Sequence, residues 1–197
     1  MCSTSSISNE GKIQILNILE KNNYCISILK FVKQLSEENL WIGGGFIRNI
    51  VWDEKHAHKI NTEFGDIDVF YFNSKCIDKD RDIEIENALR EIAPNVEWSV
   101  KNQARMHLHN HEAPYISLED ALFKFPDTAS SIVVRLSKNS NIEFIAPYGY
   151  SDLFNLLVRP TPIFLNNEIK MQRYYQRINE KKWTVKWPNL IIQKCQI

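Results

Sequence analysis

Hydrophobic residues along the chain recur at spacings typical first of helices and then of strands. In residues 12–35 they return every three or four positions, which predicts helical structure, with a break expected at Asn22-Asn23. The same spacing predicts further helices over residues 47–51, 81–93 and 167–181. These segments are amphipathic, so each is expected to bury one face against another element.

Short runs dense in β-branched and aromatic residues predict strands. The clearest run is Asp66–Phe72, with the sequence DIDVFYF. Other strands are expected at residues 40–42, 96–100, 132–136 and 142–146. Strands and helices interleave early, and two strands then follow one another, so the fold class is α/β or α+β, with a mixed sheet flanked by helices.

The length of 197 residues predicts one domain with an appendage, since a domain takes about 150 residues. The first residues are polar and rich in serine, so we expect a disordered tail over residues 1–10. A core domain is predicted over residues 11–160. Residues 161–197 are expected to form a helical appendage that packs on this core.

Composition narrows the class of protein. The 24 Lys and Arg residues balance 24 Asp and Glu residues, so no overall basic excess favours binding to nucleic acid, although a local basic patch is compatible with this balance. No apolar run approaches the ~18 residues of a membrane span. The four cysteines lack Cys-x-x-Cys spacing, and the start lacks the basic and apolar regions of a secretory signal. We therefore expect a reduced, cytoplasmic protein that does not bind membranes.

Two acidic residues and a glycine-rich turn carry the candidate chemistry. Asp66 and Asp68 lie two positions apart on a predicted strand, so their side chains share one face. Carboxylates placed together repel unless a cation lies between them, and Mg²⁺ prefers such oxygens. Gly44 and Gly45 precede a predicted helix, where backbone N–H groups can approach a phosphate closely. Arg48, one turn inside that helix, adds a charged group suited to phosphate.

This order of motifs, GGFIRN followed by a strand with DID, resembles the nucleotidyltransferase superfamily of DNA polymerase β type. The Arg-Asn version is similar to the head domain of tRNA CCA-adding enzymes and bacterial poly(A) polymerases. Further segments resemble a bacterial family of small, stand-alone nucleotidyltransferase-like proteins, at residues 41–52, 98–107, 119–121, 146–149 and 159–160. The resemblance implies a polymerase β-type fold and transfer of NMP from an NTP to an acceptor hydroxyl, dependent on Mg²⁺ or Mn²⁺, with pyrophosphate released.

The superfamily normally adds a third carboxylate on a neighbouring strand. Glu97 is the favoured candidate, because Val96-Glu97-Trp98 places an acid between hydrophobic residues after the helix that follows the DID strand. Glu143 in the run Ile142-Glu143-Phe144 is the alternative. We expect Asp66, Asp68 and Glu97 to be both the catalytic and the metal-binding residues.

The resemblance also covers the polar segment after residue 100 and implies a nucleotide-binding role there. The predicted nucleotide-binding residues are Gly44, Gly45, Arg48, Asn49, Lys101, Asn102, Arg105 and His107. A solvated loop is the alternative interpretation of residues 101–107. The acceptor stays open among a small molecule, an RNA end and a protein, because a fold does not choose a substrate.

Other functions compete with this one. A catalytically silent module with the same fold would bind a nucleotide or a partner without transfer. A zinc-dependent hydrolase would use His107, His109 and His111, which alternate as on one face of a strand. Trp183 and Trp187 are expected to cover the core edge; with nearby lysines they would alternatively form a stacking platform for a base.

Overall fold

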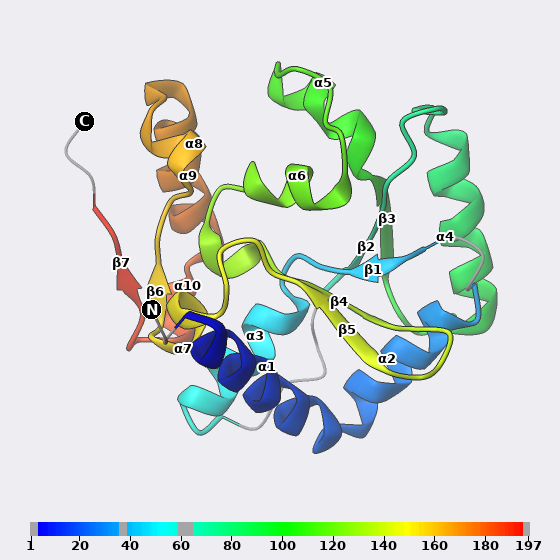
Figure 1. The fold of residues 1–197 in the computed structure, drawn as a ribbon, viewed down its shortest axis with the longest axis horizontal. Helices are drawn as coiled ribbons and strands as arrows, with labels where there is room; N and C mark the ends of the chain where they lie inside the picture. Colours follow the sequence, from blue (N-terminus) through cyan, green and yellow to red (C-terminus); the bar gives the residue numbers. More distant parts are fainter. Residues whose placement is uncertain (1–3, 36–38, 59–64, 195–197) are drawn as a thin grey trace.

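A five-stranded mixed sheet forms the centre of the molecule, as predicted (Figure 1). The computed structural model describes residues 4–35, 39–58 and 65–194. The sheet has the order β3-β2-β1-β4-β5, in which β2 and β3 are parallel and the other neighbours antiparallel. Its strands are β1 (Trp41–Ile42), β2 (Ile67–Tyr71), β3 (Trp98–Asn102), β4 (Val133–Leu136) and β5 (Ile142–Ile145).

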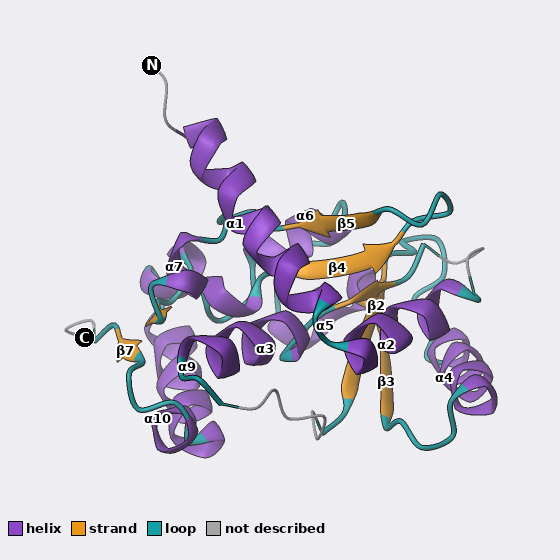
Figure 2. Ribbon diagram, turned by 90° about the horizontal axis from the view of Figure 1, so that it is seen from below, coloured by secondary structure: helices purple, strands orange, loops and turns teal. Residues whose placement is uncertain are grey.

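Helices cover both faces of the sheet. Figures 1 and 2 place α1 (Thr4–Glu20), α2 (Asn23–Lys33) and α3 (Phe46–Lys55) on one side. On the other side lie α5 (Met106–Asn110) and α6 (Leu118–Phe123), while α4 (Asp80–Ile92) connects β2 to β3. The break at Asn22-Asn23 is confirmed: Asn22 caps α2 by accepting a hydrogen bond from the Cys25 N–H.

Alternation along the strands divides the core between the two faces. Ile42 and Val69 face the large cluster that packs under α1, α2 and α3. Trp41 and Phe70 point the other way, into a smaller cluster with Leu122 of α6. Asp68 therefore shares the face of Phe70, on the side of α5 and α6.

The C-terminal part of the chain packs on the sheet domain and shares its core. It contains η2 (Thr128–Ser130), α7 (Ser151–Phe154), β6 (Leu157–Val158), α8 (Pro162–Leu165), α9 (Glu168–Lys181), α10 (Trp183–Lys186) and β7 (Ile191–Ile192). The ring of Trp52 in α3 contacts Trp183 and Trp187, at 5.5 and 5.1 Å between centroids. Both tryptophans belong to the main hydrophobic cluster, so residues 161–194 share one hydrophobic core with the sheet.

Two segments differ from the sequence-based expectation. Helix α1 begins at Thr4, so residues 4–10, predicted as a tail, continue the first helix; adding a residue to an existing helix costs far less than starting one. Residues 103–110 are helical, as η1 (Gln103–Arg105) and α5, so the prediction that His107, His109 and His111 alternate on a strand is wrong. Residues two apart on a helix do not face each other.

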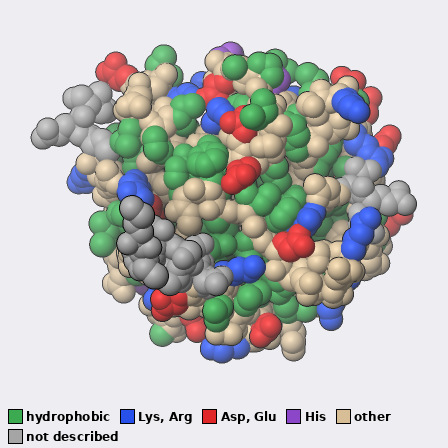
Figure 3. All heavy atoms as spheres, viewed as in Figure 1, with side chains coloured by type: hydrophobic (Ala, Val, Ile, Leu, Met, Phe, Trp, Pro, Cys, Tyr) green, Lys and Arg blue, Asp and Glu red, His purple; other side chains and the backbone are tan. Residues whose placement is uncertain are grey.

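The face of the molecule seen in Figure 3 is neither predominantly acidic nor predominantly basic. Acidic, basic and hydrophobic side chains are interspersed there, in keeping with the balanced composition. Within the described part of the chain, no helix combines the length and the apolar character needed to cross a membrane.

Candidate active site

A glycine corner follows β1 and leads into α3. The Gly43 N–H donates to the Asp68 carbonyl at 2.9 Å, which fixes the corner against β2. Gly44 has φ +59°, in the left-handed region, and a Cβ on it would lie 2.2 Å from Asp68 Oδ2. Only glycine therefore allows the chain to pass this close to the carboxylate.

Asp66 and Asp68 line one cleft together with the glycine corner. Asp68 lies in β2 with its side chain 22% exposed, and Asp66 is exposed, one residue before the strand. Both line a cavity of about 380 Å³ that Gly45 and Arg48 also line. The two carboxylates predicted from the DID spacing thus open into the same space as the glycine turn.

The cleft has two lobes of different character. The 380 Å³ cavity, here called the basic lobe, is lined by Gly45, Arg48, Asn49, Asp66, Lys181 and Lys186, together with Trp183 and Trp187. A second cavity of about 210 Å³, the aromatic lobe, is lined by Phe70, Gln103, Met106, Asn110, Phe125 and Phe164, among others. Asp68, Lys101 and Arg177 line both. These three residues border both lobes.

Lys101 lies beside Asp68, as the strand register dictates. Asp68 is paired with Ser99 across the parallel β2–β3 ladder, so Lys101, two residues further on, shares its face. The Lys101 ammonium donates to Asp68 Oδ1 at 2.8 Å. Lys101 is partly exposed, so this cation neutralises Asp68 while keeping one side open to the cleft.

Arg48 is anchored in the protein rather than extended into solvent. It is 5% exposed, and its Nη1 donates to Ser130 Oγ at 2.6 Å. Its guanidinium lies over the rings of Trp183 and Trp52, and it also donates to the Asn49 side-chain oxygen. Burial lowers the pKa of Arg48 to about 10, against the opposing effect of the Asp127 carboxylate. Arg48 thus forms a fixed positive wall of the basic lobe.

Asp127 and Arg177 are functional candidates that the sequence analysis missed. Asp127 is fully buried, and its Oδ1 accepts from the Ser130 N–H at 2.8 Å. Its Oδ2 lies 3.7 Å from Arg177 Nε, so an ion pair links η2 to α9. The pattern Asp127-x-x-Ser130 signals a turn cap, but nothing local in the sequence indicates its partner 50 positions later.

Three of the predicted nucleotide-binding residues lie outside both lobes. Asn102 is fully buried, and its amide bonds the backbone of Asn73, Cys76 and Ala104 at 2.9–3.0 Å. Arg105 donates to Asp82 and to the carbonyls at residues 77 and 78. The third of these residues is His107, whose Nδ1 lies 2.6 Å from the Ala104 carbonyl oxygen. These polar groups stabilise the segment after β3, and a role in nucleotide binding stays a prediction.

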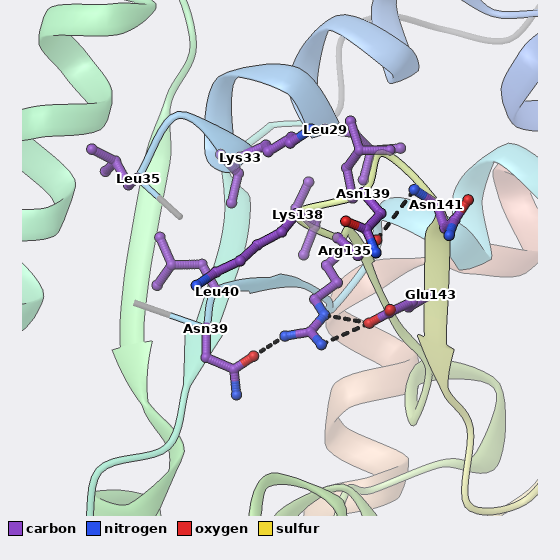
Figure 4. Close-up of a pocket in the computed structure, with 14 residues that line it drawn as sticks. Leu29, Lys33, Leu35, Asn39, Leu40, Arg135, Lys138, Asn139, Asn141 and Glu143 are labelled. Carbon is purple, nitrogen blue, oxygen red and sulfur yellow. Dashed lines mark hydrogen bonds and ion pairs between the residues drawn. The ribbon is translucent and has the colours of Figure 1, made fainter. Parts of the chain in front are cut away.

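Neither candidate for the third carboxylate lines the cleft with the DID pair. Glu97 is exposed, precedes β3 and lines neither lobe; its carbonyl accepts from the Ile67 N–H at 2.7 Å. Glu143 lies on β5, at the sheet edge opposite β3, where Arg135 bridges it to Asn39 (Figure 4). It lines a separate cavity of about 450 Å³ beside α2. Over the residues that the structure describes, no three His, Cys, Asp or Glu side chains gather as a metal-binding group.

The donor set nevertheless fits one hard cation. Mg²⁺ is commonly held by one or two carboxylates and completes its shell with water and substrate phosphate. Asp66 and Asp68 offer such oxygens at the open side of the basic lobe. A second ion would need the further carboxylate that these residues do not supply.

Comparison with known proteins defines the class of this fold and site. A family model described as a nucleotidyltransferase matches residues 30–192, which include the glycine corner, the DID strand and the whole of α9 and α10. The chain therefore belongs to this nucleotidyltransferase family, and nucleotide transfer in general is the activity of its class. No curated protein matches the chain.

Solved structures place the fold among nucleotidyltransferase head domains. An NMR structure, described as revealing a CCA-adding enzyme head domain, is 34% identical; the match covers 92% of this chain and 95% of that one, with a TM-score of 0.81. A CCA-adding enzyme with CTP is 12% identical, with coverages of 91% and 43% and a TM-score of 0.56. The Thermotoga maritima CCA-adding enzyme with tRNA is 13% identical, with coverages of 91% and 42% and a TM-score of 0.54. This chain thus spans less than half of the complete CCA-adding enzymes, which share its fold.

Proposed function

We propose that the protein transfers a nucleoside monophosphate from an NTP to an acceptor hydroxyl. The acceptor oxygen bonds to the α-phosphorus, the bond from that phosphorus to the oxygen of the β-phosphate breaks, and pyrophosphate leaves with the electron pair. The hydroxyl proton passes to the solvent. The observation that carries the proposal is the convergence of Asp66, Asp68 and the glycine corner on one cleft with basic walls.

Each group has a role in this proposal. Asp66 and Asp68 hold Mg²⁺ or Mn²⁺, which supplies positive charge to the reacting phosphate. Lys101 balances the charge of Asp68 and contacts the phosphate from the other side. Arg48 and Asn49 form the wall behind the phosphates, Gly45 lines the same lobe, and Gly44 leaves space for the Asp68 carboxylate. Catalysis then consists mainly of positioning and electrostatic stabilisation.

The class of acceptor is proposed from the relatives and from the open side of the cleft. Structures of CCA-adding enzymes hold CTP, ATP or tRNA, but those enzymes are more than twice as long as this chain. We propose that the acceptor is a small molecule, an RNA end or a protein that reaches Asp68 from the open side of the cleft.

The test uses radiolabelled NTPs with Mg²⁺ or Mn²⁺ and a cell extract, followed by separation of labelled products by size. Asp68→Asn keeps the shape of the side chain but removes its charge, and we expect pyrophosphate release to fall below detection. Asp80→Asn, an exposed residue in the first turn of α4, is the matched control and should leave the rate unchanged. Full activity of the Asp68 variant would exclude the proposed role. Glu97→Gln in the same assay decides whether this carboxylate takes part.

A silent nucleotide-binding module is the second candidate. Two observations favour it: Lys101 already neutralises Asp68, and the third carboxylate is missing from the described cleft. NTP binding that needs Mg²⁺, without pyrophosphate release from any of the four NTPs in the presence of extract, would support this candidate over transfer.

A further inference from the structure

The two lobes of the cleft differ in chemistry and meet at the candidate catalytic carboxylate. The aromatic lobe, of about 210 Å³, and the basic lobe, of about 380 Å³, share Asp68, Lys101 and Arg177 as lining residues. An NTP has the same arrangement: its α-phosphate lies between an aromatic base with its sugar and a strongly anionic β,γ-diphosphate. The order of the chemical groups therefore matches the order of the lobes.

The aromatic lobe offers flat apolar surfaces with polar groups beside them. Phe70 of β2, Phe125 in the loop after α6 and Phe164 of α8 line it together. Gln103, a residue only 3% exposed, and Asn110 also line it, and the Asn110 amide nitrogen donates to the Tyr115 hydroxyl at 2.9 Å. A nucleobase has apolar faces for aromatic contacts and donors and acceptors on its edges for amides.

The basic lobe offers positive charge from the C-terminal helices. Arg177 and Lys181 lie four residues apart on α9 and so share one helix face. Arg177 is committed in part to Asp127, and Lys186 lies 3.5 Å from the buried Asp53 carboxylate. The Lys181 side chain is exposed at the end of α9, and its ammonium group forms no hydrogen bond or ion pair with another residue in the described part of the chain. It is the cation on this wall best placed to take a new partner.

We infer, on the basis of the proposed function, that the nucleoside end of the substrate occupies the aromatic lobe and its β,γ-phosphates the basic lobe. Lys181 then recognises the triphosphate, and so selects an NTP over an NMP. The α-phosphate lies at the junction, beside Asp68. This gives the last turn of α9 a direct role in substrate recognition.

Three probes separate the lobes in calorimetric binding experiments with Mg²⁺ at low salt: inorganic tripolyphosphate, the four NMPs and the four NTPs. Lys181→Ala should weaken tripolyphosphate and NTP binding about tenfold, the loss of one charge-assisted contact, and leave NMP binding unchanged. Phe125→Leu, which keeps an apolar side chain, should weaken NMP and NTP binding about fivefold or more and leave tripolyphosphate binding unchanged. Unchanged tripolyphosphate binding also shows that this variant is folded.

Lys182→Asn is the matched control for charge. It removes the neighbouring lysine, which lines neither lobe, and asparagine tolerates its left-handed φ of 46°. The inference is overturned if Lys181→Ala binds tripolyphosphate as the control does, if Phe125→Leu weakens tripolyphosphate as much as NMP, or if the parent protein binds no tripolyphosphate. If the predicted binding pattern holds but no NTP yields pyrophosphate, the lobes are assigned correctly and the proposed transfer is wrong. Transfer with the opposite pattern leaves the proposed function standing and removes only the lobe assignment.

Discussion

Replacement of Gly44 by alanine tests whether the glycine corner and Asp68 act as a unit. The added Cβ would lie 2.2 Å from Asp68 Oδ2, whereas nonbonded carbon and oxygen atoms rest at roughly 3.5 Å. The carboxylate must therefore move by about 1 Å. Its Cγ would lie 3.0 Å from the new atom, so a rotation of the side chain relieves most of the clash and the fold survives.

The expected effect is large on function and small on stability. Alanine in the left-handed region costs about 1 kcal/mol, and a displacement of ~1 Å in a reacting group costs about 100-fold in rate. The rotation also breaks the 2.8 Å contact with Lys101. We therefore expect pyrophosphate release to fall about 100-fold and Mn²⁺ binding, followed by electron paramagnetic resonance, to weaken with it.

Gly149→Ala supplies the matched control. Gly149 has φ +67°, and a Cβ there meets nothing within 4 Å, so this variant carries the same backbone cost without the clash. Urea denaturation should give the two variants similar free energies of unfolding, while only Gly44→Ala loses activity. If the two variants have equal rates, the close contact between the glycine corner and Asp68 has no functional meaning.

The further predictions concern stability and reactivity. Arg48→Met should lower the free energy of unfolding by about 3–5 kcal/mol in urea denaturation, because it leaves the buried Asp127 with one cation fewer. Asn102→Ala should cost about 3 kcal/mol or more in the same measurement, since the backbone groups that its amide binds are left unpaired. Burial raises the pKa of Cys25 to about 12, so at pH 8 its thiol stays protonated, and mass spectrometry after iodoacetamide treatment should find Cys76 alkylated and Cys25 unmodified. The pKa of the Cys25 thiol is higher in the folded protein than in the unfolded chain. Its contribution to stability is therefore complete below about pH 8.5 and declines as the pH rises toward 12. Modification of native Cys25, or variants as stable as the parent, would contradict these expectations.

Local patterns were sufficient to predict the elements that carry the cleft. The DID strand is dense in β-branched and aromatic residues, and the three glycines stand between a strand and a helix, so both could be placed without tertiary information. The pairing of β4 with β5 likewise follows from two apolar runs across a short polar turn. Asp66 and Asp68 open into one cavity because strand geometry sets their face.

Residues whose roles depend on distant partners could not be assigned this way. Asn102 is predicted to bind the nucleotide because the resemblance covers the polar segment after residue 100. In the folded chain its amide hydrogen-bonds the backbone of Asn73, Cys76 and Ala104, which the sequence does not indicate, and the nucleotide-binding role stays a prediction. Asp127 appears only as a turn cap, although burial and Arg177 make it a charged link between two elements. Such roles depend on which side chains become buried. The spacing of residues in the sequence predicts burial in helices and strands but not in irregular segments.

The C-terminal segment is better understood as one wall of the cleft than as an addition to a finished domain. Trp183 covers the Arg48 guanidinium at 4.4 Å, and the Trp187 indole N–H donates to the buried Asp53 at 2.7 Å. The contacts that fold α10 onto α3 are thus the contacts that hold a positive charge at the edge of the basic lobe. Since α9 supplies Arg177 to the same lobe, the packing of this segment and the electrostatics of the cleft depend on each other.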